Sequence, residues 1–313
     1  MKKRESSRRK LSRRELSRRE SSQIGQEFTH LDKIIFPQDN FTKEDVITYY
    51  QKIAPFLLPH INNHLIVMQR FPEGIDHEGF YQKQISDYFP AWIQRKTISL
   101  KKGNDQTLLL VNTQKDLAYL ANQNVIVFHS WLSSIDHINK PSKIVFDLDP
   151  DNNSLQEIHT IAKAIKKLLE QHGLIPFIMT TGSRSYHVVI PIKPEHSFDI
   201  IHEFAKQIAQ HIAQQYPLFC TADLTKEQRK NKIFIDYLRN SYGQTSVAAY
   251  SLRAHEKAPV ATPIEWKELS TTAPQKYTLK NIFKRLARKQ DPWKDFSKKA
   301  KPVILEQKTK DVP

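Results

Sequence analysis

The sequence contains little cysteine and no long run of apolar residues. Cys220 is the one cysteine among 313 residues, which excludes a disulfide within the chain and suits the reducing conditions of the cytosol. No apolar stretch approaches the roughly 20 residues that a membrane-spanning helix requires. We therefore expect a soluble, cytoplasmic protein without a membrane partner.

Acidic residues are scarce relative to basic ones. The chain has 48 Lys and Arg against 33 Asp and Glu, which gives a formal net charge of +15. An excess of this size indicates a polyanionic partner, with nucleic acid as the first candidate and an anionic membrane surface as the second. Residues 1–24 contribute +7 of this charge, from ten Lys and Arg against three Glu.

Residues 1–24 also lack the apolar side chains that a folded core needs. The five-residue sequence LSRRE occurs twice in tandem, at Leu11–Glu15 and Leu16–Glu20. Charged, low-complexity sequence of this kind is typical of a disordered segment. We expect a disordered basic tail that either binds phosphates without sequence preference or has no dedicated task.

The centre of the chain shows a clear succession of strand and helix patterns. A capping box at Ser154 and Glu157 opens a helix with an apolar stripe, and Gly173 ends it. The other expected elements are strands at 143–150, 175–181, 186–192 and 232–238 and a helix at 199–216. The order β-α-β-β-α-β is that of the split βαβ, ferredoxin-like unit, whose two helices would cover one face of the sheet.

Two carboxylates, Asp147 and Asp149, stand two residues apart at the end of an apolar run. Side chains at positions i and i+2 of a strand point to the same face, and like charges held there repel unless a cation neutralises them. The pattern indicates a divalent-metal site on the sheet. The alternative is a plain turn, because Asp and Pro commonly end strands.

A third carboxylate and a histidine are expected on the same open face. Asp236 follows the apolar residues Ile233–Ile235, and His187 lies in the strand at 186–192. A buried carboxylate without a partner costs several kcal/mol, so Asp236 requires a metal ion or an arginine. Carboxylates that clamp two metal ions are the usual device for in-line phosphoryl transfer.

The chain carries a series of motifs in a characteristic order. They are FTHLDKIIFP (28–37), TKEDVITYY (42–50), GFYQK (79–83), FHSW (128–131), FDLDP (146–150), TTGSRSYHV (180–188), FIDYLRN (234–240), SVAAYSLR (246–253), APVATPIEWKEL (258–269) and DPW (291–293). Together they resemble the polymerase domain of bacterial ligase D, which belongs to the archaeo-eukaryotic primase superfamily and works in non-homologous end joining. The resemblance covers residues 28–295.

The resemblance implies an α+β fold. It would consist of a primase-polymerase palm, a split βαβ or RRM-like antiparallel sheet packed with helices, fused to an N-terminal α/β subdomain. The expected division is a disordered basic tail at 1–24, a primase-polymerase domain at 25–295 with an N-terminal subdomain at 25–140 and a catalytic palm at 141–295, and a C-terminal tail at 296–313.

The resemblance also implies the residues of a polymerase active site. Asp147, Asp149 and Asp236 would be the catalytic residues and the ligands of two Mn²⁺ or Mg²⁺ ions. Hydroxyl, imidazole and cationic side chains would bind the incoming nucleotide, namely Thr181, Arg184, His187, Arg253, His129 and Lys83. Taken without the family, His129 is also compatible with an ordinary half-buried histidine.

Two contacts with DNA follow from the same resemblance. Lys33 and Lys43 would bind the 5′-phosphate at the far side of a gap or break, with one of them near a helix N-terminus. Phe80 and Tyr81 would stack on template bases. Judged from the residues alone, two lysines in a basic protein carry no such meaning, and the two aromatic residues would more often belong to a core.

Two further residues carry expectations about local structure. We expect Arg239, which follows the strand of Asp236, to be a solvated strand end. Ser185 stands where the family turn usually has Gly, so a left-handed backbone position there would be strained.

The predicted function is that of a nucleotidyltransferase, a polymerase that adds ribo- or deoxyribonucleotides to a primer 3′-hydroxyl at gaps or double-strand breaks. The expected partners are DNA with gaps, overhangs or breaks, NTP or dNTP, Ku, and a separate ATP-dependent DNA ligase, because no K-x-D-G adenylation motif appears. Such a protein would be associated with the nucleoid. The alternatives are a catalytically idle DNA-end-binding module that recruits Ku and a ligase, and a two-metal nuclease.

Overall fold

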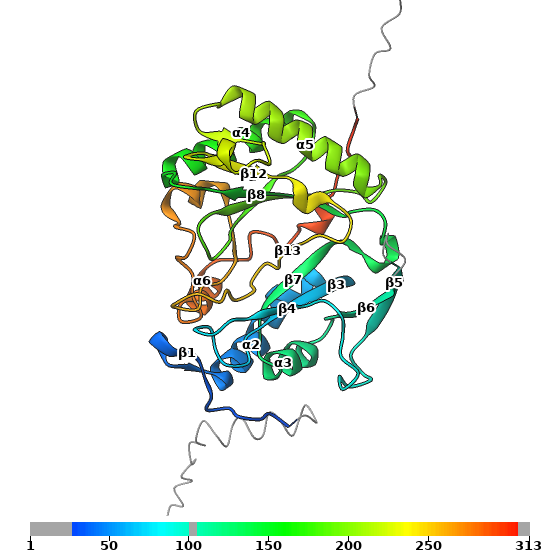
Figure 1. Ribbon diagram of the computed structural model, residues 1–313, viewed down its shortest axis with the longest axis vertical. Coiled ribbons are helices and arrows are strands. Elements are labelled where there is room, and N and C mark those ends of the chain that lie inside the picture. Colours follow the sequence, from blue (N-terminus) through cyan, green and yellow to red (C-terminus); the bar gives the residue numbers. More distant parts are fainter. Residues whose placement is uncertain (1–26, 100–104, 306–313) are drawn as a thin grey trace, which may run out of the picture.

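The computed structural model describes residues 27–99 and 105–305. They form two large β-sheets, which lie between two pairs of helices, and a small two-stranded sheet (Figure 1). Helices α4 and α5 lie at one side of the molecule, and α2 and α3 lie at the opposite side, with both sheets between them. Among the described residues, none of the helices combines the length and the apolar character needed to cross a membrane.

The C-terminal sheet has six strands and contains the motif with the two carboxylates. Its strands, in spatial order, are β11 (Cys220–Thr221), β12 (Ile233–Asp236), β8 (Lys143–Asp149), β10 (Tyr186–Pro191), β9 (Phe177–Thr180) and β14 (Thr262–Ile264). All neighbours are antiparallel except β11 and β12. With α4 (Leu155–Gln171) and α5 (Phe198–Gln215), the chain order from β8 to β12 confirms the predicted β-α-β-β-α-β unit.

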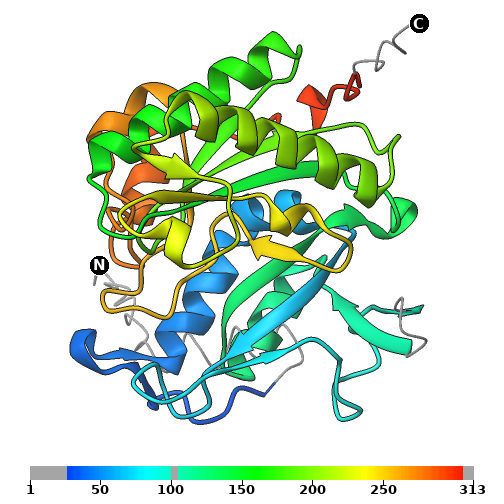
Figure 2. The same ribbon diagram turned by 45° about the horizontal axis from the view of Figure 1, so that its top comes forward.

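One face of the C-terminal sheet is covered by α4 and α5, which lie side by side in Figure 2. Ile144, Phe146 and Leu148 of β8 are fully buried in the core that contains these helices. The expected capping box starts α4, since Ser154 accepts from the backbone of Glu157 and the Glu157 carboxylate accepts from the backbone of Ser154. Because strand side chains alternate, Asp147 and Asp149 point to the opposite face, which α4 and α5 leave uncovered. This face packs in part against the N-terminal half of the chain, since Val145 is fully buried in the core that contains α2.

The N-terminal sheet contains β13 (Thr245–Val247), β7 (Val125–Ser134), β3 (His64–Arg70), β6 (Asp105–Leu110) and β5 (Arg95–Ser99) in that order, and β4 (Phe80–Gln82) pairs with β3. Helices α2 (Lys43–Ile61) and α3 (Gln114–Asn122) pack together against it. Ahead of α2, β1 (Ile34–Phe36) and β2 (Phe41–Thr42) form a small ladder. These layers confirm the predicted α+β class with antiparallel sheets packed against helices.

The two halves of the chain share structure across residue 140. Strand β13 completes the N-terminal sheet although it follows the C-terminal sheet in the sequence, and the Tyr49 hydroxyl donates to the carbonyl of Tyr250 at 2.7 Å. Helix α6 (Ile282–Arg288) joins the core of α2, and Val303 is buried beneath the C-terminal sheet. The boundary at 140/141 stays a prediction, as does the tail at 1–24, which lies outside the described residues.

Short 3₁₀ helices connect the larger elements. They are η1 (Pro37–Asp39), η2 (Ile135–His137), η3 (Glu227–Arg229), η4 (Leu238–Asn240), η5 (Trp266–Thr271) and η6 (Ser297–Lys299).

Asn240, the last residue of η4, fastens this turn to β8. Its Oδ1 accepts from the backbone nitrogen of Val145 at 2.8 Å, and its Nδ2 donates to the carbonyls of Val145 at 2.8 Å and Tyr237 at 2.9 Å. The side chain has no exposed surface. Asn240 thus pairs with β8 as another strand would, and it fixes the chain directly after Asp236.

We predict that Asn240→Ala lowers the free energy of unfolding by about 2–4 kcal/mol, because it leaves two buried backbone groups of Val145 without partners. Denaturant titration followed by circular dichroism measures this difference. The exposed Asn62→Ala is the matched control and should change stability by less than about 0.5 kcal/mol. Equal stability of the two variants would contradict the assigned role of Asn240.

Candidate active site

Three neighbouring strands bring Asp147, His187 and Asp236 into one row. Asp147 of β8 is the register partner of both His187 on β10 and Asp236 on β12. His187 Nε2 lies 3.3 Å from Asp147 Oδ1. Asp149 stands two residues further along β8, so it belongs to the same uncovered face. The four residues therefore share one face of the C-terminal sheet, as expected from the sequence.

Arg239 lies between the two central carboxylates, which shows that the expectation of a solvated strand end is wrong. Its Nη2 is 3.0 Å from Asp147 Oδ2, and its Nε is 3.4 Å from Asp236 Oδ2. The residue is in η4, which turns back toward β8 after β12 ends. The reversal of direction brings the guanidinium over the carboxylates, and strand periodicity gives no sign of it.

The environment moves the pKa values of the two carboxylates in opposite directions. Burial alone would raise the pKa of Asp147, but His187 and Arg239 hold this pKa well below its usual range. Burial raises the pKa of Asp236 above its ordinary value, although Arg239 offsets part of the effect. Asp147 is consequently the fixed negative charge of the site.

Asp149 has a cation of its own. Arg184 Nη2 donates to Asp149 Oδ1 at 2.8 Å, and both side chains are largely exposed. Arg184 comes from the turn between β9 and β10, so this contact joins the turn to the end of β8. All three predicted catalytic carboxylates thus have arginine partners.

A pocket of 170 Å³ opens beside these carboxylates, between the two sheets. Asp147, Asp149 and His187 line it from the C-terminal sheet, and Tyr81 and His129 line it from the N-terminal sheet. Its remaining lining residues are Leu148, Thr181, Ser183, Arg184, Ser185, Arg239, Val247 and Arg253. The structure therefore gathers five of the six predicted nucleotide-binding residues. The sixth, Lys83, is exposed and does not line the pocket.

The turn from Thr181 to Ser185 is held by its own side chains. The Thr181 hydroxyl donates to the carbonyl of Ser185 at 2.9 Å, and Arg253 Nη1 donates to the carbonyl of Thr181 at 2.8 Å. The left-handed residue of the turn is Gly182, with φ +66°, whereas Ser185 does not have a positive φ. The strain expected at Ser185 is therefore absent.

His129 is a buried histidine with one ring nitrogen free of protein partners. Nε2 has no hydrogen-bond partner among the described residues, and the ring contacts Tyr81 at 5.4 Å between centroids. Burial, together with Arg253, Arg239 and His187, lowers the pKa of His129 to about 3. The imidazole is neutral at physiological pH, and its Nε2 can bind a polar group that enters the pocket.

The two lysines predicted at the 5′-phosphate site lie side by side. The backbone nitrogen of Lys43 donates to the carbonyl of Lys33 at 2.8 Å, and Lys43 is the first residue of α2. Lys43 is only 4% exposed, and burial, Lys33 and Arg70 lower its pKa to about 8. The Lys33 ammonium pairs with Glu73 at 2.9 Å.

The predicted stacking residues are on the surface rather than in the core. Phe80 is 45% exposed and Tyr81 is 59% exposed, and both belong to β4 at the open side of the N-terminal sheet. The Arg70 guanidinium lies 5.5 Å from the centre of the Phe80 ring. Arg70 therefore covers one face of the Phe80 ring, and both aromatic side chains keep exposed surface.

The carboxylates fit a divalent cation in chemistry but not in their present arrangement. Carboxylate oxygens on adjacent strands are the donors that Mg²⁺ and Mn²⁺ prefer. Across residues 27–99 and 105–305, however, no three His, Cys, Asp or Glu side chains are grouped closely enough to hold a metal ion. Arg239 occupies the space between Asp147 and Asp236, and Arg184 engages Asp149. Metal binding therefore requires these arginine contacts to open.

A second hollow, of 220 Å³, adjoins the carboxylates at the end of β8. Its lining includes basic side chains that were not among the predicted site residues. Besides Asp149 and Arg184, it is lined by Lys226, Arg229, Lys230 and Lys232. Arg229 packs on the Phe234 ring at 3.5 Å. The one signal in the sequence is the run of basic residues ahead of β12.

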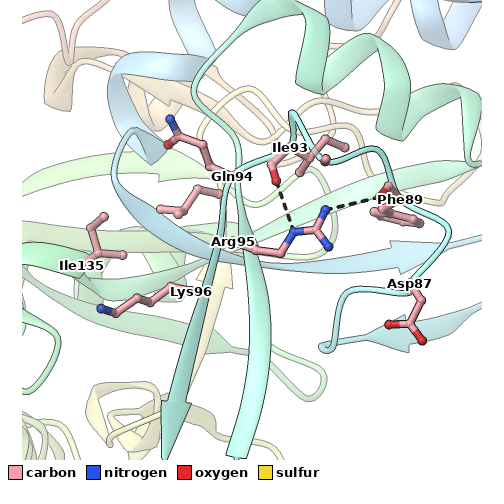
Figure 3. A pocket seen from close by; sticks show the side chains of 9 residues that line it. Asp87, Phe89, Ile93, Gln94, Arg95, Lys96 and Ile135 are labelled. Carbon is pink, nitrogen blue, oxygen red and sulfur yellow. Dashed lines mark hydrogen bonds between the residues drawn. The ribbon is translucent and has the colours of Figure 1, made fainter.

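A larger hollow lies elsewhere and lacks a comparable set of groups. It has a volume of 710 Å³ beside β5 and is lined by Phe89, Ile93 and Arg95, among others (Figure 3). The guanidinium of Arg95 is already bound to the carbonyls of Phe89, Pro90 and Ile93. Size alone therefore does not mark the functional site in this molecule.

The fold, with three carboxylates on the open face of a β-α-β-β-α-β unit, belongs to the primase-polymerase class. Within that class, residues 42–293 match the family described as "LigD, primase-polymerase domain". The chain belongs to this family.

Known relatives agree with this assignment. The chain is 30% identical over 272 residues to the multifunctional non-homologous end joining DNA repair protein LigD of Mycobacterium tuberculosis, and 31% identical over 274 residues to the bifunctional LigD of Bacillus subtilis. The matches cover 84% and 86% of this chain but only 36% and 44% of those proteins. The chain thus spans less than half the length of these relatives.

A solved structure shows the same architecture. The polymerase domain of Mycobacterium tuberculosis ligase D, determined in complex with DNA, superposes with a TM-score of 0.82 at 29% sequence identity. The match covers 88% of this chain and 98% of that domain. The expected primase-polymerase fold is thereby confirmed.

If the pocket binds a nucleoside triphosphate as the sequence predicts, Gly182→Ala should weaken that binding. Alanine at either Gly182 or Gly173 must adopt a positive φ, which costs about 1–2 kcal/mol. At Gly182 the added Cβ would also meet Arg253 Cγ at 2.8 Å, whereas at Gly173 it meets nothing within 4 Å. Calorimetric titration should show a loss of about tenfold or more in affinity for Gly182→Ala alone, and an equal loss in Gly173→Ala would contradict this assignment.

Proposed function

We propose that this chain is a DNA-end repair polymerase that adds ribo- or deoxyribonucleotides to a primer 3′-hydroxyl at gaps and double-strand breaks. The observation that carries the proposal is the row of Asp236, Asp147 and His187 beside a pocket that also contains Thr181 and Arg253. A nuclease would need the carboxylates but not the hydroxyl, imidazole and guanidinium groups gathered opposite them. Ku and a separate ATP-dependent DNA ligase are its proposed partners.

The three carboxylates are the proposed ligands of two Mn²⁺ or Mg²⁺ ions. Such ions, when bound, would activate the primer hydroxyl and neutralise charge on the triphosphate. Asp147 stays ionised and lies on the central strand, so it can serve both ion positions. Asp236 lies beside it on β12, and Asp149 lies two residues further along β8 on the same face.

Around the nucleotide, the pocket offers donors matched to phosphate oxygens. Arg253 and Arg184 supply charge, and the ring nitrogens of His187 and His129 supply shorter-range contacts. The Thr181 hydroxyl is proposed to join them once it releases the carbonyl of Ser185. Arg253 is anchored through Thr181, which orients its guanidinium before a ligand arrives. Lys83, from the strand next to Tyr81, is proposed to reach the nucleotide from the rim.

DNA is proposed to lie across the open side of both sheets. Phe80 and Tyr81 would stack on template bases, and Lys33 and Lys43 would hold the downstream 5′-phosphate at the N-terminus of α2. Lys43 is buried and partly desolvated, so a phosphate dianion would stabilise its charged form. The cations that line the 220 Å³ hollow would add contacts to a DNA backbone.

We predict that Asp147→Ala or Asp236→Ala lowers primer extension on gapped DNA by roughly a thousandfold or more. Each substitution removes a carboxylate that would contribute several kcal/mol to stabilisation of the transition state. Extension with Mn²⁺ and NTP measures the loss, and EDTA should abolish the wild-type activity. Glu195→Ala, which removes an exposed carboxylate from the connection between β10 and α5, is the control and should extend normally.

Both active-site variants should still bind gapped DNA in a mobility-shift assay. Normal extension by either variant would refute the metal-site assignment. If the wild-type protein bound gapped DNA but failed to extend it whichever metal ion was added, an idle end-binding module would be the better description.

We predict that the preference for 5′-phosphorylated gapped DNA over the 5′-hydroxyl form declines as the pH rises from 7 to 9. Lys43 has a pKa lowered to about 8, so it loses its proton in this range, whereas the phosphate remains a dianion because its second pKa is about 6. Fluorescence anisotropy at constant ionic strength measures the ratio of the two affinities.

Lys33→Ala combined with Lys43→Ala should erase the preference at every pH. Lys52→Ala, an exposed lysine on the same helix, should retain both the preference and its pH dependence. Equal affinity of the wild-type protein for the two DNA forms at pH 7 would disprove the phosphate site.

A further inference from the structure

The C-terminal half of helix α2 borders a hollow that has no part in the proposed reaction. This hollow has a volume of 490 Å³ and lies between α2 and α6. Its lining is apolar and basic and includes Pro55, Phe56, Pro59, Leu286, Arg288 and Lys294. None of these residues lines the two hollows beside the carboxylates. Lys43 is the first residue of α2, so Pro55 is about 18 Å further along the helix from the proposed 5′-phosphate site.

Buried polar contacts hold the floor of this hollow in place. His60 Nε2 lies 3.1 Å from Asp291 Oδ2, and the Tyr250 hydroxyl donates to Asp291 Oδ1 at 2.7 Å. The backbone nitrogen of Trp293 donates to the same oxygen at 2.9 Å. The Asp291 side chain is only 11% exposed, so its partners inside the chain satisfy its charge. The hollow is therefore formed before any ligand arrives.

The rim of the hollow carries positive charge that the described residues do not neutralise. Arg288 and Lys294 are exposed, and neither forms an ion pair within residues 27–99 and 105–305. Lys289, the third cation of the lining, is already bound to two glutamates. Asp291 is the one acidic residue that lines the hollow, and it is occupied as described above. Two cations therefore remain available to an anionic ligand.

Two prolines within α2 leave backbone carbonyls without helical donors. Proline has no N–H, so Pro55 gives no hydrogen bond to the carbonyl of Gln51, and Pro59 gives none to that of Pro55. The side chain of Gln114 donates to the carbonyl of Gln51 at 2.9 Å. No side chain in the described part of the chain does this for Pro55, which lines the hollow. Its carbonyl can accept a backbone N–H of a bound peptide.

These groups fit a protein segment better than a nucleic acid. Phosphates would find partners in Arg288 and Lys294, but they would leave the apolar surface of Phe56 and Leu286 uncovered. We propose that the hollow between α2 and α6 binds a short acidic segment of a partner protein. Its carboxylates would lie beside the two cations, and one or two of its apolar side chains would fill the space between the two helices.

The occupant has to come from another molecule. The segments of this chain that lie outside the described residues are not acidic: residues 1–26 have ten Lys and Arg against three Glu, residues 100–104 have two Lys and no acid, and residues 306–313 have two Lys against one Glu and one Asp. The inference goes beyond the proposed function, because no residue of this hollow takes part in nucleotide addition.

Selection of short random peptides displayed on phage, with the full chain as bait, tests the chemistry of the occupant. Peptides that combine Asp or Glu with Leu, Ile, Phe or Trp should be enriched. The most enriched peptide is then labelled with fluorescein and titrated by anisotropy. Replacement of its apolar residues by Ser should weaken binding by about tenfold or more, because they are expected to fill the hollow. Attraction by charge alone would not respond to this change.

Variants of the chain test the place of binding. Arg288→Glu combined with Lys294→Glu should weaken binding of the selected peptide by about tenfold or more. Lys163→Glu combined with Lys167→Glu makes the same charge change on the exposed side of α4 and should weaken it by less than about threefold. Ala287→Trp fills the hollow without a change of charge and should also prevent binding. Circular dichroism checks that each variant is folded.

The outcomes separate this inference from the proposed function. Both double variants should bind gapped DNA with equal affinity and extend primers at equal rates. The inference is wrong if no acidic peptides are enriched, or if the selected peptide binds the variant of Arg288 and Lys294 as tightly as it binds the control. It is also wrong if that variant loses affinity for gapped DNA relative to the control, since the two cations would then belong to the DNA path. Primer extension by the wild-type protein tests the polymerase assignment independently.

Discussion

Two like charges that face each other across a pair of strands set the main constraint on this molecule. Asp147 and Asp236 are register partners, and the backbone hydrogen bonds between β8 and β12 do not compensate the charges of their side chains. Relief comes from Arg239, whose position depends on the turn that Asn240 fastens to β8. The hydrogen bonds that fix the chain after Asp236 therefore also place the guanidinium of Arg239 between the two carboxylates, where it offsets part of their repulsion.

The central unit and its carboxylates could be predicted because the signals are periodic and local. The capping box and apolar stripe define α4, and the two-residue spacing of Asp147 and Asp149 places both on one face. Arg239 could not be assigned, because its partners depend on a chain reversal rather than on a strand or helix period. The place of β13 in the N-terminal sheet could not be predicted either. Its pairing with β7 is not indicated by any local pattern in residues 245–247.

Charges that would bind ligands are already paired within the chain at both ends of the proposed DNA path. Arg184 and Arg239 hold the carboxylates, while Glu73 holds Lys33 at the opposite site. Each contact neutralises a group that would otherwise stand uncompensated near another charge of the same sign. At either proposed site, a ligand would then have to compete with a partner inside the chain, and binding would be an exchange of partners.

The late position of β13 in the chain has a consequence for biosynthesis. The N-terminal sheet obtains its edge strand from residues 245–247, and the side chains of Tyr49 and Tyr50 in α2 hydrogen-bond to residues 250 and 252, about 200 positions later. A nascent chain that has emerged as far as residue 140 cannot complete this core, and the wall that β13 contributes through Val247 to the 170 Å³ pocket is still missing. Most of the polypeptide must therefore leave the ribosome before the pocket can close. Contacts of such long sequence separation are typical of slowly folding topologies.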